Sequence, residues 1–160
     1  MATPTPLSYL WVTATQASND AYVQASISTG LLNQTGLAYS VKEILWEFPS
    51  LGGASLWNAE MQLAVKSAAA MSGTKVADKT VLARQMHSMG LLTSGGGPIS
   101  NIERQLFTDD YPLYLVNDPL YLQCDSNATA ASNIFCIRIG YEVVKLSDVL
   151  RLSLVAASLS

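Results

Sequence analysis

The single histidine is the first residue of this sequence that could do chemistry. His87 is the only imidazole among 160 residues, so the sequence excludes a metal site built from several histidines. A catalytic triad would also need a nucleophile and an orienting acid, and no motif supplies them. We therefore interpret His87 as a surface or groove residue of the segment 83–92.

Two adjacent carboxylates, Asp109 and Asp110, precede Tyr111 and are the next candidates. Such a pair could bind calcium or transfer a proton. A calcium loop needs several further oxygen ligands at fixed spacing, and none follow. We expect no metal at this position.

A run of glycines, Gly95 to Gly97, has the composition of a phosphate-binding loop. The Lys and the Ser or Thr of a P-loop are missing, and no helical pattern follows directly. We interpret residues 94–100 as a flexible loop between two halves of similar β character.

Three tryptophans could form a stacking platform for sugars or bases: Trp11, Trp46 and Trp57. Trp46 alternates with Ile44 and Phe48, and this spacing favours a place in the core for it.

The two cysteines, Cys124 and Cys136, flank one loop and have a spacing that a disulfide could bridge. The phase of the flanking strands argues otherwise. If the apolar faces of segments 120–125 and 134–146 meet, Cys124 points into the core and Cys136 points outwards. We predict two free thiols.

None of these candidates is interpreted as a catalytic, cofactor-binding or metal-binding residue. We therefore predict a protein that is not an enzyme and holds no cofactor. Apolar residues make up 49% of the chain and charged residues 13%, against roughly 25% charged residues in ordinary soluble domains. This composition excludes intrinsic disorder. It also leaves an isolated monomer with few charged side chains to cover its surface.

The sequence argues against a nucleic-acid partner and against a membrane span. The formal net charge is −3, and 9 basic residues are spread singly among 12 acidic ones. No basic cluster is therefore available to neutralise phosphates. The longest weakly polar stretch, 149–160, is too short to span a bilayer.

The N-terminal sequence carries no targeting pattern. The first charged residue is Asp20, so neither the basic start of a secretory signal nor a transit peptide is present. We expect an untargeted chain that starts at Met1 and is found in the virion, if viral, or otherwise in the cytoplasm. The glycosylation sequons at Asn33 and Asn127 are then chance matches.

Alternation of apolar and polar residues predicts strands in the first half of the chain. Residues 21–29 and 61–65 alternate strictly, each with one polar, wet face. Between them, apolar residues occupy odd positions over 37–41 and even positions over 44–48. A one-residue slip of phase within one strand predicts a β-bulge.

The second half predicts strands over 111–116, 120–125 and 134–146, the last being the clearest. The type of segment 75–92 stays open: Asp78 could cap a helical turn through Leu82, after which 83–92 extends. After residue 146, Ser147 could cap a short helix from Asp148, or alternation of leucines could continue as a strand.

About eight short strands with no long amphipathic helix between them predict an all-β fold, an antiparallel two-sheet sandwich with at most short helical turns. We expect three parts: residues 1–20 as an extended N-terminal arm or first strand, 21–148 as the β-sandwich domain, and 149–160 as an apolar C-terminal segment at an interface. The expected core consists of Val23, Ile27, Tyr39, Ile44, Trp46, Leu63, Val65, Leu122, Ile137, Ile139 and Tyr141.

Residues 117–148, NDPLYLQCDSNATAASNIFCIRIGYEVVKLSD, and the early strands that end in EILWEFPS resemble the strand order of small single jelly-roll virion proteins. The resemblance implies an eight-stranded sandwich that assembles with copies of itself into a shell. Many capsid proteins that package naked nucleic acid carry a basic N-terminal arm, whereas residues 2–19 here are uncharged. This departure argues against direct contact with a genome.

The sequence thus predicts a self-assembling structural protein, a viral capsid protein or another virion component. Its expected partners are copies of itself and other virion proteins. The alternative is a ligand- or carbohydrate-binding β-sandwich module, which would need exposed aromatic residues beside polar loops.

Overall fold

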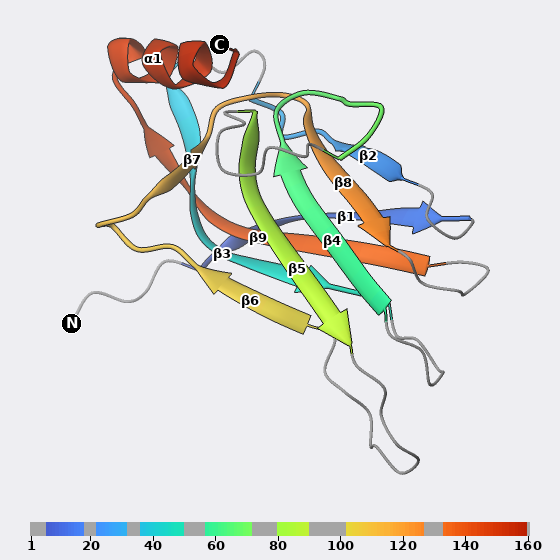
Figure 1. Ribbon diagram of the computed structural model, residues 1–160. Helices are drawn as coiled ribbons and strands as arrows, with labels where there is room; N and C mark the ends of the chain where they lie inside the picture. Colours follow the sequence, from blue (N-terminus) through green and yellow to red (C-terminus); the bar gives the residue numbers. More distant parts are fainter. Residues whose placement is uncertain are drawn as a thin grey trace.

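The computed structural model describes residues 6–17, 22–31, 36–49, 57–71, 80–89, 102–126 and 133–159, which form nine strands and one helix. In chain order (Figure 1) the elements are β1 (Ser8–Gln16), β2 (Val23–Ile27), β3 (Leu37–Glu47), β4 (Trp57–Ala64), β5 (Val81–Met89), β6 (Ile102–Leu106), β7 (Leu113–Leu115), β8 (Leu120–Ser126), β9 (Asn133–Lys145) and α1 (Asp148–Leu159). The all-β prediction is confirmed.

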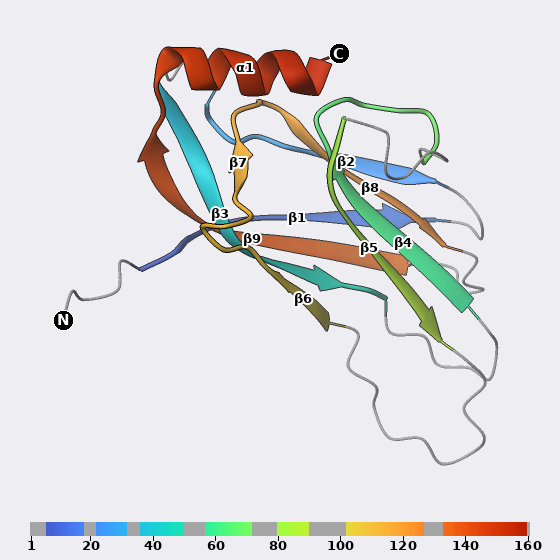
Figure 2. The same cartoon turned by 60° about the vertical axis from the view of Figure 1, so that its left-hand side comes forward.

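The strands form two antiparallel sheets that lie one over the other (Figure 2). The first sheet has the order β1-β9-β3-β6, with the short β7 also paired to β3, and the second has the order β2-β8-β4-β5. The predicted two-sheet sandwich is therefore confirmed.

The strand pairs follow the pattern of one long antiparallel ribbon. With β7 set aside, the first strand pairs with the last (β1–β9), the second with the next to last (β2–β8), and so on through β3–β6 and β4–β5. Rolling this ribbon over a core brings β9 beside β3 and β8 beside β4. This order is that of a jelly roll.

A β-bulge in β3 lies where the sequence predicts it. The register between β3 and β9 shifts between Val41 and Glu43, so that Val41 pairs with Tyr141 and Ile44 with Ile139. The extra residue lets Val41 and Ile44, three positions apart, both face the core, where each is buried.

The core lies between the inner faces of the two sheets. All the predicted core residues are buried except Val23, Tyr39 and Tyr141, which are half-buried. The two tyrosine rings stack with their centroids 4.0 Å apart, and the Tyr39 hydroxyl donates a hydrogen bond to the carbonyl oxygen of Thr29 at 2.6 Å. A tyrosine needs a partner for its hydroxyl, which favours the edge of a core over its centre.

A buried polar cluster joins the two sheets. The Gln16 side-chain oxygen of β1 accepts hydrogen bonds from the Ser126 hydroxyl of β8 at 2.7 Å and from the Asn133 amide of β9 at 2.8 Å. Buried polar groups are costly unless they are paired in this way, so the cluster favours one relative position of the sheets.

The predicted helical turn from Asp78 through Leu82 is wrong at its C-terminal end. Leu82 belongs to β5, which pairs with β4 as an antiparallel strand. The pairing uses the backbone groups that a helical turn would need. Asp78 itself lies outside the described residues, and the expected extension from residue 83 is confirmed as far as Met89.

The strand over 61–65 does not have the single wet face that its alternation predicts. Gln62 and Ala64, which should face water, are buried along with Met61 and Leu63. Gln62 donates a side-chain hydrogen bond to Gln123 of the neighbouring β8, and Gln123 in turn donates to the carbonyl oxygen of Lys66. These bonds let amide side chains be buried on this outer face.

The C-terminal segment is helical, so the alternative of a strand is wrong. The backbone N–H of Leu150 donates to the Ser147 hydroxyl at 3.3 Å, the N-cap bond expected of this serine. Figure 2 shows α1 lying across the end of the sandwich where β9 finishes. Within the described part of the chain, no helix has both the length and the apolar character needed to span a membrane.

Replacing Ile137 with Ala tests the phase of β9. Ile137 has no exposed surface, so its loss should lower the free energy of unfolding by about 2–5 kcal/mol. Ile134 lies on the same strand but is 56% exposed, and Ile134→Ala should cost less than about 0.5 kcal/mol. Urea unfolding of both variants at one protein concentration measures the difference. Equal losses for the two would show that the strand faces are assigned wrongly.

Candidate interaction surface

His87 lies between the edge strands of the two sheets. Its Nδ1 is 3.2 Å from a carboxylate oxygen of Glu103 in β6, and its ring stacks on Phe48 with centroids 5.1 Å apart. The side chain is mostly buried. His87 therefore joins β5 to β6 across the side of the sandwich, and of the surface or groove position expected for it, the open surface position is wrong.

The aspartate pair lies in a tight turn between β6 and β7. The N–H of Tyr111 bonds to the carbonyl oxygen of Thr108, and Asp109 is 3.3 Å from the ammonium of Lys42. Among the residues that the structure describes, no three His, Cys, Asp or Glu side chains gather as a metal site would require. The glycines 95–97 and both sequons lie outside the described residues.

The cysteines have the predicted orientations, although the pairing used to predict them is wrong. Segment 120–125 forms β8 in the second sheet and does not pair with β9 of the first. Cys124 is buried in the core, Cys136 is half-buried on the outer face of the first sheet, and both thiols are free. Burial raises the pKa of the Cys124 thiol well above its ordinary value.

The outer face of the first sheet brings together side chains from four strands. Register places Trp11, Arg138, Leu45 and Arg104 in one row across β1, β9, β3 and β6. The neighbouring rows are Tyr9, Gly140, Glu43 and Leu106 on one side, and Thr13, Cys136, Glu47 and Ile102 on the other. We call these three rows the outer sheet face.

Large apolar side chains on the outer sheet face are open to solvent. Trp11 is 70% exposed, Leu106 61% and Ile102 54%. Ile102 and Leu106 are exposed because β6 turns its apolar side outwards. Its polar residues Glu103 and Gln105 face inwards, which is the opposite of the usual arrangement. Glu103 contacts His87, and Gln105 accepts a hydrogen bond from the Trp46 indole at 3.3 Å. These bonds fix β6 with its apolar side outwards.

Sequence reasoning did not identify β6 at all. The signal that could have found it is the alternation of Ile102, Arg104 and Leu106 with Glu103 and Gln105.

Charged groups on the outer sheet face are partly paired with each other. The Arg104 guanidinium donates to one Glu43 oxygen through Nε at 2.8 Å and through a terminal nitrogen at 2.5 Å, and the Tyr9 hydroxyl donates to the other oxygen at 3.1 Å. The Arg138 guanidinium lies 5.3 Å from the centre of the Tyr9 ring. Gly140 leaves room for this arrangement, because a Cβ there would lie 2.9 Å from Glu43.

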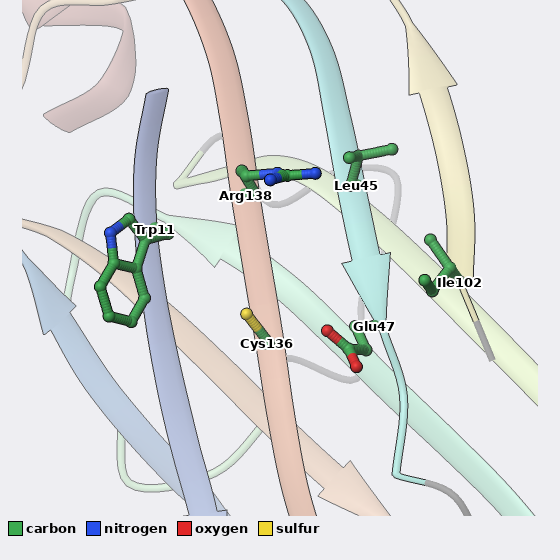
Figure 3. Close-up of a pocket in the computed structure, with 6 residues that line it drawn as sticks. All are labelled: Trp11, Leu45, Glu47, Ile102, Cys136 and Arg138. Atoms are coloured by element: carbon green, nitrogen blue, oxygen red, sulfur yellow. The ribbon is translucent and has the colours of Figure 1, made fainter. Parts of the chain in front are cut away.

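A shallow hollow of about 350 Å³ opens in this face (Figure 3), lined by Trp11, Leu45, Glu47, Ile102, Cys136 and Arg138. Figure 3 shows that these side chains come from β1, β9, β3 and β6. The hollow combines an indole and two aliphatic side chains with one cation, one carboxylate and one thiol. Such a lining suits an apolar side chain that has polar neighbours.

The groups around the hollow change the pKa of the Cys136 thiol. Burial raises the pKa of Cys136, the carboxylate of Glu47 raises it further, and the guanidinium of Arg138 lowers it. The neutral thiol is therefore favoured at neutral pH, which makes Cys136 a weak nucleophile.

The two outer faces of the sandwich differ in character. On the second sheet, Gln62 and Gln123 are buried and bonded to each other, and Glu60 forms an ion pair with Arg84. Met86 of β5 is the one large apolar side chain exposed on the described part of the second sheet's outer face, whereas on the first sheet Trp11, Ile102 and Leu106 are all exposed. Of the three tryptophans, Trp46 is in the core as predicted, Trp11 is on the outer sheet face, and the Trp57 side chain lies outside the described set.

No protein-family model and no curated protein matches this sequence. Among solved structures, the chain is similar to the structure of tomato aspermy virus at 9% identity and a TM-score of 0.48, covering 88% of this chain and 80% of that one. It is also similar to an unassembled Washington University polyomavirus VP1 pentamer at 10% identity and a TM-score of 0.44, covering 91% and 96%.

A third similar structure is a VLP of the extra small virus of the giant freshwater prawn Macrobrachium rosenbergii, at 5% identity and a TM-score of 0.34, covering 88% and 82%. All three are structures of viruses or of viral proteins. The assignment of the fold rests on the strand order of this chain itself.

Reaction of the thiols with iodoacetamide tests the geometry and electrostatics of the hollow. Without reductant, folded protein should be labelled at Cys136 and not at the buried Cys124, and denatured protein should be labelled at both. Because Glu47 raises the pKa of Cys136, the variant Glu47→Gln should have more thiolate and react faster at pH 8. Glu103→Gln, on the inner side of β6, is the control and should leave the rate unchanged.

Mass spectrometry counts the labels. A denatured, unlabelled protein that is two hydrogens lighter would mean that a disulfide forms. Equal rates for Glu47→Gln and the unaltered protein would mean that Glu47 does not face Cys136.

Proposed function

We propose that this chain is a structural protein that assembles with copies of itself, as a capsid protein or another component of a virus particle. The observation that carries the proposal is the outer sheet face, where Trp11 on β1 and Ile102 and Leu106 on β6 are all exposed. Large apolar side chains exposed among charged ones on one face of a sheet suit a site of association between proteins. The proposal assigns the chain no catalytic role.

Composition supports the same proposal. With 13% charged residues, the chain has about half the charged side chains usual for a soluble monomer. Obligate interfaces between subunits are hydrophobic and commonly exceed roughly 2,000 Å² of buried surface. Assembly through apolar faces would therefore account for both the composition and the exposed side chains.

The virion part of the proposal draws on the resemblance of the strand pattern to single jelly-roll virion proteins. The expected partners are copies of the chain and other proteins of the particle. Direct binding of nucleic acid is not expected, because the 9 basic residues are scattered and residues 2–19 carry no charge.

A ligand- or carbohydrate-binding module is the second candidate. The observation that favours it is Trp11, an exposed indole beside Glu47 and Arg138 in the hollow. Sugars stack on such side chains while polar neighbours bond their hydroxyl groups. A module of this kind would work as a monomer, and this difference separates the two candidates.

The assembly state of the purified full-length chain tests the proposal. Sedimentation velocity over a range of protein concentrations, with negative-stain microscopy of the same samples, should give discrete rings or shells. A single monomer boundary at every concentration would contradict assembly and favour the binding module.

Truncations test whether the chain ends take part. Deleting the last ten residues, or residues 2–6, should give smaller species or insoluble protein if the ends lie at interfaces. The N-terminal deletion stops at Pro6 because Ser8 to Leu10 pair with β9 and are needed for the fold. If the truncated chains sediment as the full-length protein does, the chain ends take no part in assembly.

A further inference from the structure

The two sheets end in four edge strands, β1 and β6 in the first sheet and β2 and β5 in the second. Edge strands are normally protected from pairing with another chain by short length, charged side chains or a bulge. Strands β2 and β6 have five residues each, Glu103 of β6 faces inwards, and β5 carries Arg84 and a register shift against β4. By contrast, the nine residues of β1, SYLWVTATQ, contain no charge and no proline and pair with β9 without a shift.

The free side of β1 suits a further extended strand. Among the strands that the structure describes, β1 pairs with β9 alone, so its other side presents backbone N–H and C=O groups that a strand can bind. On the inner side of β1, Leu10 and Val12 pack against the core but stay half-buried, whereas Ala14 is buried. A strand added beside this half of β1 would cover Leu10 and Val12.

The two aromatic side chains of β1 point in opposite directions across the strand. Tyr9 leans over β9: its hydroxyl donates to Glu43 of β3 at 3.1 Å, and its ring lies above Gly140, where a Cβ would be 3.0 Å from it. Trp11 is 70% exposed, and Figure 3 shows its indole on the side of β1 that faces away from β9. An added strand would therefore lie beneath the Trp11 indole.

A second copy of β1, running antiparallel, matches both directions. If the two strands meet about a two-fold axis at Leu10, Trp11 of each copy lies opposite Tyr9 of the other. Each indole then extends over a position from which the tyrosine has turned away, and aromatic pairs directly opposite each other stabilise antiparallel strands. Because β1 has no charged residue, identical strands meet without repulsion between like charges.

We propose that β1 pairs with β1 of a second copy, antiparallel and centred on Leu10, so that the two first sheets form one continuous sheet. The inference rests on the proposed self-assembly and names the strand that carries it. Pairing from Ser8 to Val12 uses as many residues as the pairing of β2 with β8 within the chain. The contact is isologous, so it closes on two copies and leaves other surfaces for larger assembly.

An engineered cysteine at the axis tests the strand and its register. In Leu10→Cys the two new thiols lie directly opposite, where the Cα atoms of antiparallel strands are about 4.5–5.5 Å apart, within the range of a disulfide. Mild oxidation of the assembled full-length variant should give a two-chain product on non-reducing, denaturing electrophoresis. Val12→Cys is the matched control: it is also half-buried on the inner side of β1 but lies opposite Ser8 of the other copy. This variant, and the unaltered chain with its own Cys136, should give single chains.

A mixture of two variants tests the same register without changing Leu10. Ser8→Cys and Val12→Cys should each give single chains when oxidised alone. Mixed in dilute solution and then concentrated, they should give a two-chain product, because Ser8 of one copy lies opposite Val12 of the other. Circular dichroism checks that each variant is folded, and the mixture keeps the test decisive if Leu10→Cys fails to fold.

The outcomes separate this inference from the proposed function. A two-chain product from Leu10→Cys or from the mixture, with single chains from the controls, supports the pairing. If the unaltered chain assembles but neither gives this product, or if Val12→Cys alone gives it equally, pairing centred on Leu10 is overturned while self-assembly stands. An unaltered chain that sediments as a monomer at all concentrations would overturn both.

Discussion

The extra residue in β3 is the constraint on which the arrangement of both faces of the first sheet depends. Before the bulge, Val41 points into the core, and after it Ile44 and Trp46 do so, with almost no exposed surface on any of them. Without the bulge, one half of this central strand would turn its apolar side to water, and each buried side chain is worth about 1.5–3 kcal/mol. The bulge also turns Glu43 outwards, where Arg104 and Tyr9 bind it.

The bond to Arg104 links the bulge to the edge strand β6. On the inner side of β6, Glu103 contacts His87 and Gln105 accepts a hydrogen bond from Trp46. On its outer side, Arg104 donates a hydrogen bond to Glu43. Both sets of polar bonds favour the same orientation of β6. The consequence is that Ile102 and Leu106 face solvent. The exposure of these two side chains is thus a result of the polar bonds that orient β6.

Local patterns predicted the strands but not their partners. Alternation found segments 120–125 and 134–146 because burial of one face leaves a period of two in the sequence. It could not tell that β8 and β9 belong to different sheets, since pairing between distant strands leaves no mark in either one. Val143 illustrates a further limit: its phase places it with the core residues of β9, yet near the end of the strand it is 56% exposed.

The interaction surface was harder to predict than the fold. In β1, Tyr9 and Trp11 alternate with Leu10 and Val12, so both faces are apolar and the sequence does not say which is buried. In β6 the polar residues face inwards, which reverses the rule that located the other strands. The helix was recognisable from Ser147 as a cap, but its leucines also alternate as in a strand. Only the assembled sheets show which of these side chains remain exposed.

Protection from hydroxyl-radical labelling tests most directly whether copies of the chain cover these apolar surfaces. Labelling is compared, residue by residue, between concentrated protein and protein diluted until it dissociates. Trp11 and Leu106 should be labelled strongly in dilute protein and weakly in concentrated protein, while Tyr111 should be labelled equally in both. Equal labelling of Trp11 and Leu106 at all concentrations would mean that the outer sheet face stays open to water, and would contradict the account.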